Sequence, residues 1–337
     1  PATMASGSVG TGPFVLESHE VGVKSVSVKN EGFDWWGYAA GRECPLDRIE
    51  YIDYGTDPAA WLAAAEADEV DCFYENVGEY VDVMEGIGWE NSEIATGSTI
   101  LIRPNQTTPD ADGNTVYADK RVRQALAMAV DNNICLELGY ANKGAPADNH
   151  HAGSMHPEHD PSVGRLPYDP AKAKALMAEA GMADYEHELI SIDDDWRKNT
   201  TDAVAAQLRD AGIKVKRTIL PGSTFWNDWA KYPFSSTNWN HRPFAVQVWG
   251  LAYRSGEAWN EMGWSNAEFD ALLAEANAIA DADKRRVVAG KCQALIAEEG
   301  CTIQPYWRSL YRSHSSNTVC DMHIAYHAHV YKWGFKA

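Results

Sequence analysis

The sequence lacks the local signals by which several common classes of protein are recognised. It holds no uninterrupted apolar run of about 18 residues, so it predicts no membrane-spanning helix. No GxSxG, HExxH or Walker-type motif occurs, so no motif indicates catalysis, and we expect a protein that is not an enzyme. A hydrolase is the third-ranked alternative, because a Ser/His/Asp set is recognised by geometry rather than by sequence.

Basic residues are scarce relative to acidic ones. The chain has 29 Lys and Arg against 48 Asp and Glu, which gives a formal net charge of −19. Nucleic-acid binding needs a basic surface that neutralises phosphates, so we expect no nucleic-acid partner. The opening residues, PATMASGSVGTGPF, lack the basic segment and apolar run of a signal peptide. That is typical of a cytosolic chain, or of a mature or truncated product.

The six cysteines include no CxxC pair, so the usual zinc-ribbon spacing is absent. Cys292 lies on an expected helix and Cys301 directly after it. These two could form a disulfide if the loop folds back, and buried free thiols are the alternative.

Hydrophobic periodicity predicts a mixed α/β chain. In the first hundred residues we expect strands over 14–20, 24–30, 46–54, 70–76 and 97–105, and a helix with Pro58 in its first turn. This order predicts a βαβ unit with a parallel pair. A second βαβ unit is expected over residues 187–220.

The remaining segments are mainly helical. We expect helices over 119–131, 168–181, 265–280 and 281–300, with Asp119, Asp169 and Asn266 as N-caps. FAVQVWG (244–250) is predicted to be a buried strand, and residues 302–314 return as strands. Residues 140–168 are rich in Gly, Pro, His and Asn, which indicates a long surface connection.

Five segments in register resemble one family. They are GTGPFVLESHEVGVKSVSVKN (10–30), DKRVRQALAMAVD (119–131), YDPAKAKALMAEAG (168–181), SNAEFDALLAEA (265–276) and EEGCTIQPYWR (298–308). Together they resemble the peptide/nickel-type family of extracellular solute-binding proteins of ABC importers, without its N-terminal part. The resemblance implies the two-lobed, type II periplasmic-binding-protein α/β fold, with central mixed sheets flanked by helices. Residues 1–110 and 308–337 would belong to lobe I, and residues 111–307 would form lobe II.

The same resemblance implies a function. The protein would capture a small solute in a cleft between its lobes, close over it and deliver it to a transmembrane permease. We therefore expect a monomer without a cofactor, which is periplasmic or lipid-anchored and extracellular.

The stretch VWGLAYRSGEAWNEMGW (248–264) supplies the first candidate ligand residues, namely Trp249, Tyr253, Arg254, Glu257 and Trp259. The resemblance places Arg254 where peptide-binding members carry an aspartate that pairs with the ligand's α-ammonium. An arginine there favours a carboxylate or phosphate instead. If the alignment slips by a few residues, Glu257 serves as the anchor.

Three more residues extend this candidate site. Arg103 lies on the expected strand over 100–105, and Trp239 and Arg242 lie in NWNHRPF (238–244). An aromatic-walled site with guanidinium groups suits a peptide, an opine-like or other anionic amino-acid derivative, or an acidic glycan fragment. The structural alternative is that the aromatic residues form core, and that Arg254 pairs with Glu257 or Glu261 on a surface turn.

Histidines provide the second functional alternative, a metal or metal-chelate (nickel- or haem-type) binder. HHAGSMHPEH (150–159) holds four of them, and His323, His327 and His329 lie near the C-terminus. Imidazole is a common metal ligand. The irregular spacing is equally typical of a solvated loop, so we assign no metal ligand from sequence.

Overall fold

The computed structural model describes residues 10–55 and 57–336. These residues divide into two compact units. Unit 1 comprises the chain up to Ile94 and again from Leu310, and unit 2 is Ala95–Ser309. The stretch compared with a signal peptide in the sequence comprises residues 1–14. Residues 1–9 of this stretch lie outside the residues that the structure describes. Among the described residues, no helix is long and apolar enough to cross a membrane.

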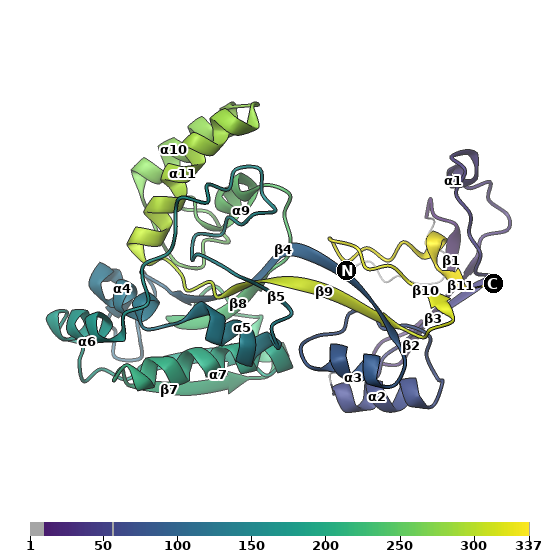
Figure 1. Cartoon of the computed structure of the whole chain (residues 1–337), viewed down its shortest axis with the longest axis horizontal. Coiled ribbons are helices and arrows are strands. Elements are labelled where there is room, and N and C mark those ends of the chain that lie inside the picture. The colour runs from purple at the N-terminus through teal and green to yellow at the C-terminus, as the bar shows by residue number, and fades with distance from the viewer. Residues whose placement is uncertain (1–9, 56, 337) are drawn as a thin grey trace. The chain divides into compact units, whose positions relative to one another are not determined.

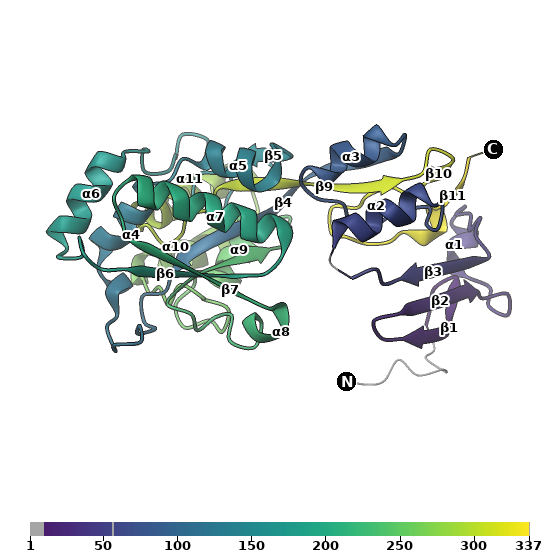
Figure 2. The same cartoon turned by 90° about the horizontal axis from the view of Figure 1, so that it is seen from below.

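Unit 1 is built on a small antiparallel sheet, whose three strands lie side by side in Figure 2. Its elements are β1 (Phe14–Glu20), β2 (Lys24–Lys29), α1 (Trp36–Ala39), β3 (Arg48–Ile52), α2 (Pro58–Glu66), α3 (Tyr80–Gly86), β10 (Thr318–Val319), η2 (Val330–Lys332) and β11 (Gly334–Phe335). A core of Phe73, Met84 and Trp89 packs against α2. Asp57 caps α2 and Pro58 occupies its first turn, as the sequence predicts.

The prediction of a parallel strand pair in this region is wrong. Strands β1, β2 and β3 pair antiparallel, in the order β1-β2-β3. The segment 70–76 forms only isolated bridges, Cys72 to His314 and Asn76 to Tyr311. Backbone hydrogen bonds join Phe73 to Ser313 and Asn76 to Tyr311, so the segment runs beside β9 (Tyr306–His314) without forming a continuous strand.

Two long strands carry the chain from one unit to the other, β4 (Glu90–Pro104) and β9 (Tyr306–His314). The first division between the units falls within β4, after Ile94, and the second falls within β9, after Ser309. The lobe boundaries near residues 110 and 308 that the resemblance implies remain a prediction. A continuous strand gives no local sequence signal for the point at which its contacts change.

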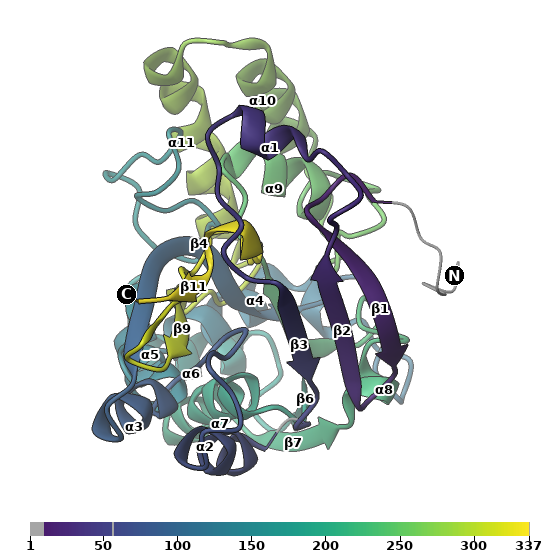
Figure 3. The same ribbon diagram turned by 90° about the vertical axis from the view of Figure 1, so that its right-hand side faces the viewer.

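Unit 2 contains a mixed sheet in the order β5-β9-β4-β8-β6-β7. Its other elements are η1 (Val116–Ala118), α4 (Lys120–Met128), α5 (Asn132–Tyr140), β5 (Gly144–Pro146), α6 (Pro170–Glu179), β6 (His187–Ile192), α7 (Asp195–Asp210), β7 (Val215–Leu220), α8 (Gly222–Phe225), β8 (Phe234–Trp239), α9 (Ala245–Ala252), α10 (Ala267–Ala278) and α11 (Ala282–Glu299). Helices α5 and α7 lie on one side of this sheet, and α10 and α11 lie on the other (Figures 1 and 3).

The second βαβ unit is confirmed. Strands β6 and β7 are parallel, with His187 opposite Val215, and α7 connects them. The expected N-caps are confirmed as well: the side chains of Asp119, Asp169 and Asn266 each accept a hydrogen bond from the first turn of α4, α6 and α10. The mixed α/β class with a helix-flanked central sheet is therefore as expected.

The predicted strand over 244–250 is wrong, because the segment forms helix α9. Its buried residues include Ala245, Val248, Trp249 and Ala252, which follow helical spacing and pack into a hydrophobic core of unit 2. A short apolar run buried on most sides has no periodicity that separates strand from helix.

The segment 140–168 is a long connection, but its middle part is buried and does not lie on the surface as expected. His150, His151, His156 and Glu158 are buried within unit 2. All six cysteines carry free thiols, including Cys292 and Cys301.

Candidate functional site

The stretch 248–264 consists of the end of α9 followed by an irregular turn. The backbone of this turn is held by Asn260, whose amide nitrogen donates to the carbonyls of Arg254 (3.0 Å) and Trp264 (2.7 Å). Gly263 has φ +59, and a Cβ there would lie 2.4 Å from Thr107 Oγ1. Only glycine fits this position, because the turn approaches the neighbouring loop so closely.

Arg254 projects from this turn into solvent, with 59% of its side chain exposed. Its Nε lies 3.4 Å from Glu257 Oε1. From the sequence, Glu257 and Glu261 are the two alternative partners of Arg254, and this contact is the first of them. The geometry leaves the guanidinium accessible and its planar fork open to a further anionic group.

Arg103 lies in the interior of unit 2, where its side chain is fully buried and forms an ion pair with the equally buried Glu261. Its guanidinium also donates to the carbonyls of Glu261 and Trp229. Burial lowers the pKa of Arg103, and the Glu261 carboxylate opposes that shift. The guanidinium is therefore held by protein groups, and the expectation that Glu261 pairs with Arg254 is not met.

Three of the four aromatic candidates are buried and hydrogen-bonded within the unit. The indole Nε1 of Trp239 donates to Glu261 Oε1 (2.8 Å), and that of Trp249 donates to the carbonyl of His150 (3.0 Å). The hydroxyl of Tyr253 lies 3.1 Å from His151 Nδ1.

Trp259 differs from these three residues, because it is 47% exposed and packs edge-on against Trp239 with ring centroids 5.8 Å apart. Trp259 therefore offers an open aromatic surface near Arg254.

Unit 2 also contains a pair of packed imidazoles, which the sequence did not predict as a unit. His156 stacks on His241 at 6.5 Å between centroids, and His241 Nδ1 accepts a hydrogen bond from the backbone of Gly97 at 2.9 Å. Trp307 packs edge-on against His156 at 5.5 Å. A Cβ at Gly97 would lie 3.0 Å from both imidazoles, so glycine permits this close packing.

Burial lowers the pKa of two imidazoles in this region, those of His151 and His156. Burial lowers the pKa of His156 to about 4. Its hydrogen bond to the Arg242 carbonyl raises the pKa, but by less than burial lowers it. The pKa of His151, which is fully buried among aromatic rings, is also lowered by burial. Arg242 is half-buried and donates to the carbonyl of His241. No local sequence signal joins Gly97, His156, His241 and Trp307, since they come from different elements.

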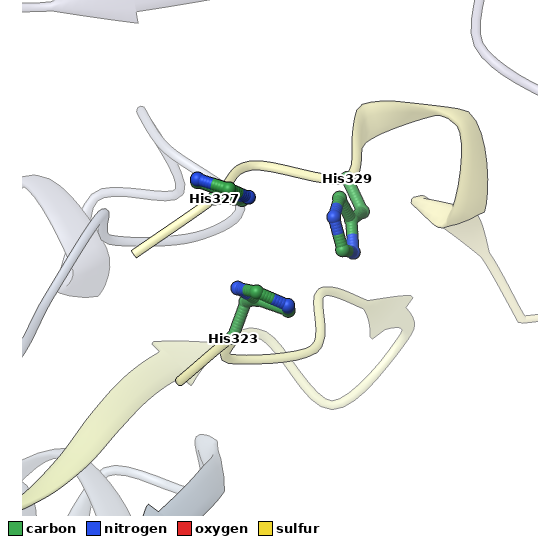
Figure 4. A group of neighbouring side chains, drawn as sticks. All are labelled: His323, His327 and His329. Atoms are coloured by element: carbon green, nitrogen blue, oxygen red, sulfur yellow. The ribbon is translucent and has the colours of Figure 1, made fainter. Parts of the chain in front are cut away.

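Two groups of side chains have the spacing of a metal site in the described part of the chain. In unit 2, Asp148, His150 and His159 come together, but both nitrogens of His150 are occupied. Its Nε2 bonds to the carbonyl of Val163 (3.1 Å), and its Nδ1 accepts from the backbone of Ala152 (3.4 Å). In unit 1, His323, His327 and His329 come together near the C-terminus (Figure 4).

Unit 1 also contains a cavity of about 480 Å³. It is lined by β3, by residues 69–74 and by the C-terminal residues 318, 320 and 333–335. Cys72 and Cys320 lie in its wall beside Phe73 and Trp333. None of the sequence patterns predicted this cavity.

With the geometry established, the relationship to known proteins is clear. Residues 2–260 match the model of the bacterial extracellular solute-binding proteins, family 5 middle region. The chain belongs to this family. The match covers more than half of the chain and agrees with the resemblance found in the five sequence segments.

The chain is also similar to individual curated proteins, at low identity. It is 26% identical over 323 residues to heme-binding protein A of Haemophilus influenzae, covering 88% of this chain and 54% of the relative. It is 24% identical over 322 residues to the probable peptide ABC transporter periplasmic-binding protein y4tO of Sinorhizobium fredii, covering 88% and 59%. The chain therefore spans little more than half the length of these relatives.

The fold is shared with a protein of solved structure. The oligopeptide-binding protein AppA of Bacillus subtilis, in complex with a nonapeptide, superimposes with a TM-score of 0.80 at 20% identity. The superposition covers 97% of this chain and 66% of that one. This likeness confirms the expected periplasmic-binding-protein class of the fold.

Proposed function

We propose that the protein is the substrate-binding component of an ABC importer, which captures a small solute and passes it to a membrane permease without chemical change. The observation that carries this proposal is the family match over residues 2–260. Relatives are named as peptide and haem binders, and one is named as part of a peptide ABC transporter. Family members act outside the cytoplasm, so we place this protein in the periplasm or at the outer face of the membrane, as a monomer.

Within that function, we infer that the turn at 254–259 contacts the ligand. Arg254 presents an exposed guanidinium on a turn whose backbone is held by Asn260, and Trp259 presents an exposed indole. A guanidinium binds a carboxylate in a two-pronged geometry, and an indole packs against an apolar or sugar-like body. Glu257 competes for Arg254 in the absence of ligand, and Arg242 lies half-buried nearby in sequence.

The remaining predicted contacts have structural partners that support a different role. Arg103, Trp239, Trp249 and Tyr253 are buried and hydrogen-bonded inside unit 2. We propose that they support the turn rather than touch the solute. The favoured ligand is a small molecule with an anionic group, such as an acidic peptide or a carboxylated amino-acid derivative.

The experiment begins with mass spectrometry of any small molecule that the purified protein releases on denaturation. The affinity of the identified compound is then measured by calorimetry for the wild type, Arg254→Ala and Arg254→Asp. Loss of a charge-assisted pair worth about 1.5–3 kcal/mol weakens binding roughly 10- to 100-fold, and the aspartate weakens it further by repulsion. Arg286→Ala is the matched control, because Arg286 forms a similar exposed i,i+3 pair with Asp283.

Different results would contradict these inferences at different levels. Unchanged affinity in both Arg254 variants removes the role of Arg254 but leaves the importer function standing. Two outcomes contradict the function itself. In one, the protein releases no solute and also binds none from a panel of peptides and amino-acid derivatives. In the other, the protein converts its ligand to a product.

A further inference from the structure

Three imidazoles gather in the C-terminal segment of unit 1, at a distance in sequence from every residue discussed as a ligand contact. His323, His327 and His329 each direct a ring towards one shared space (Figure 4). One nitrogen from each ring lies within 4.8 Å of the others. Ring centroids are 4.9 Å apart for His323 and His327, and 4.5 Å apart for His323 and His329.

Local backbone structure produces this gathering, because the spacing of the three residues is not helical. The chain turns at Tyr326, which has φ +60 and whose amide donates to the carbonyl of His323 at 2.9 Å. The carbonyl of Tyr326 accepts from the hydroxyl of Tyr74 at 2.8 Å, which ties the turn to the rest of unit 1. After the turn, His329 directly precedes η2 as its N-cap residue, and its carbonyl accepts from the amide of Lys332. The imidazoles are therefore held together by a fastened turn.

We propose that His323, His327 and His329 bind one borderline divalent transition-metal ion, of the class of Ni²⁺ or Zn²⁺, with water or an exogenous ligand in the remaining positions. Imidazole nitrogens suit these ions, whereas Ca²⁺ and Mg²⁺ require oxygen ligands. Metal–nitrogen bonds of about 2.0–2.1 Å bring ligand atoms closer together than 4.8 Å. Rotation of the side chains can supply this contraction, since His327 is exposed and the other two rings are only half-buried.

The charges around the three rings bear on how an ion would be held. A metal ion binds an imidazole through a ring-nitrogen lone pair, so it competes with protons for that nitrogen. The nearby cations Arg42, Arg312 and Lys332 repel a bare ion. Binding therefore depends on the nitrogen–metal bonds and not on a favourable surface field.

One existing contact has to change. His323 Nδ1 accepts a hydrogen bond from the amide of Ala325 at 3.1 Å. An ion at Nδ1 displaces this amide, and an ion at Nε2 moves the ring proton to Nδ1, so the bond is lost in either case. Exchange of the Ala325 amide proton should accelerate when metal binds.

The test uses tag-free protein dialysed against a chelator and titrated calorimetrically with NiCl₂ and with ZnCl₂. We expect one ion per chain for the wild type. His327→Gln should weaken binding at least roughly 10-fold, since loss of a ligand costs no less than loss of its supporting partner. His327 is exposed, so this variant should fold. The visible absorption of bound Co²⁺ should differ between the variant and the wild type.

Two controls locate the ion. His19→Gln removes an exposed imidazole elsewhere in unit 1, and His159→Gln removes a member of the other candidate group in unit 2. Both should bind as the wild type does. The proposal is overturned if the wild type takes up neither metal, if His327→Gln binds normally, or if His159→Gln abolishes uptake.

Discussion

Arg103 and Glu261 form an ion pair in which neither side chain is exposed to solvent. The same carboxylate accepts hydrogen bonds from Thr237 Oγ1 (2.7 Å) and Trp239 Nε1 (2.8 Å), both on β8. The backbone carbonyl of Glu261 accepts from Arg103 and from Asn105. The exposed turn that carries Arg254 is thus anchored to β4 and β8 through Glu261.

The first prediction concerns this anchor. Glu261→Gln leaves the buried charge of Arg103 without its counter-ion, so the free energy of unfolding should fall by about 3–5 kcal/mol. Urea unfolding followed by tryptophan fluorescence measures the change. The double variant with Arg103→Met should recover part of the loss, because both charges are then absent.

The control for this prediction is Glu257→Gln, which breaks the exposed pair with Arg254. A solvent-exposed pair contributes about 0–1 kcal/mol, so its effect should be small. Equal effects of Glu261→Gln and Glu257→Gln would show that the buried pair is not an anchor.

The second prediction concerns acid sensitivity. Burial lowers the pKa of His156 and of His187 to about 4 in the folded state, from an ordinary value near 6.5. The unfolded chain therefore binds more protons between these values, and the stability from each neutral ring is complete above about pH 6.5. It is lost progressively as the pH falls towards 4, by roughly 3 kcal/mol for each ring.

The substitution His187→Gln removes one of the two buried imidazoles, and so tests its contribution to the loss of stability in acid. The His187 ring lies 3.1 Å from the hydroxyl of Tyr117, and a glutamine amide can retain that hydrogen bond. The variant's unfolding free energy, measured from about pH 7 to pH 4.5, should fall less steeply than that of the wild type. Exposed His19→Gln should follow the wild-type slope, and an unchanged slope in His187→Gln would contradict the assignment.

The third prediction concerns the contact between α5 and α7. A Cβ at Gly139 would lie 2.3 Å from Thr200 Oγ1 and 2.7 Å from Thr200 Cα, so Gly139→Ala must push the helices apart. We expect a loss of about 1–3 kcal/mol in the free energy of unfolding. Gly250→Ala is the control, because Gly250 lies in α9 with no atom within 4 Å of an added Cβ. That variant should gain up to about 1 kcal/mol, and similar losses in both would refute the close approach.

Comparison with the sequence shows which features are local. The caps at Asp119, Asp169 and Asn266 were predicted, because a cap depends on the residues of one turn. The βαβ unit over 187–220 was predicted for a similar reason, since its strands and helix follow one another in order. The helix α9 was missed because a short buried apolar run has no decisive period.

The candidate site was predicted less well, because its contacts join distant parts of the chain. Arg103 was expected to face a ligand, yet its partner Glu261 lies 158 residues further along. The packing of His156 on His241 depends on Gly97, which has no sequence signal of its own. Arg254 and Trp259 are exposed on one turn, and their contact with a ligand remains a prediction.

The last prediction concerns two thiols in unit 1. The side chain of Cys72 hydrogen-bonds to that of Cys320, which lowers the pKa of Cys320 and raises that of Cys72. A more acidic thiol forms the attacking thiolate more readily. In an oxidising compartment, a disulfide oxidant can accept the two protons and two electrons that Cys72 and Cys320 lose as they join.

Thiol titration of the unfolded protein, after oxidation and without reductant, tests this pairing. Closure of one Cys72–Cys320 bond leaves four of the six thiols, whereas Cys72→Ser and Cys320→Ser should each leave five because no bond can form. Cys44→Ser is the control and should leave three, since it removes a thiol outside the pair. Six thiols in the oxidised wild type, or a bond that survives in Cys320→Ser, would contradict the prediction. Cys292 and Cys301 are both fully buried, and we expect them to remain reduced throughout, because neither is accessible to an oxidant.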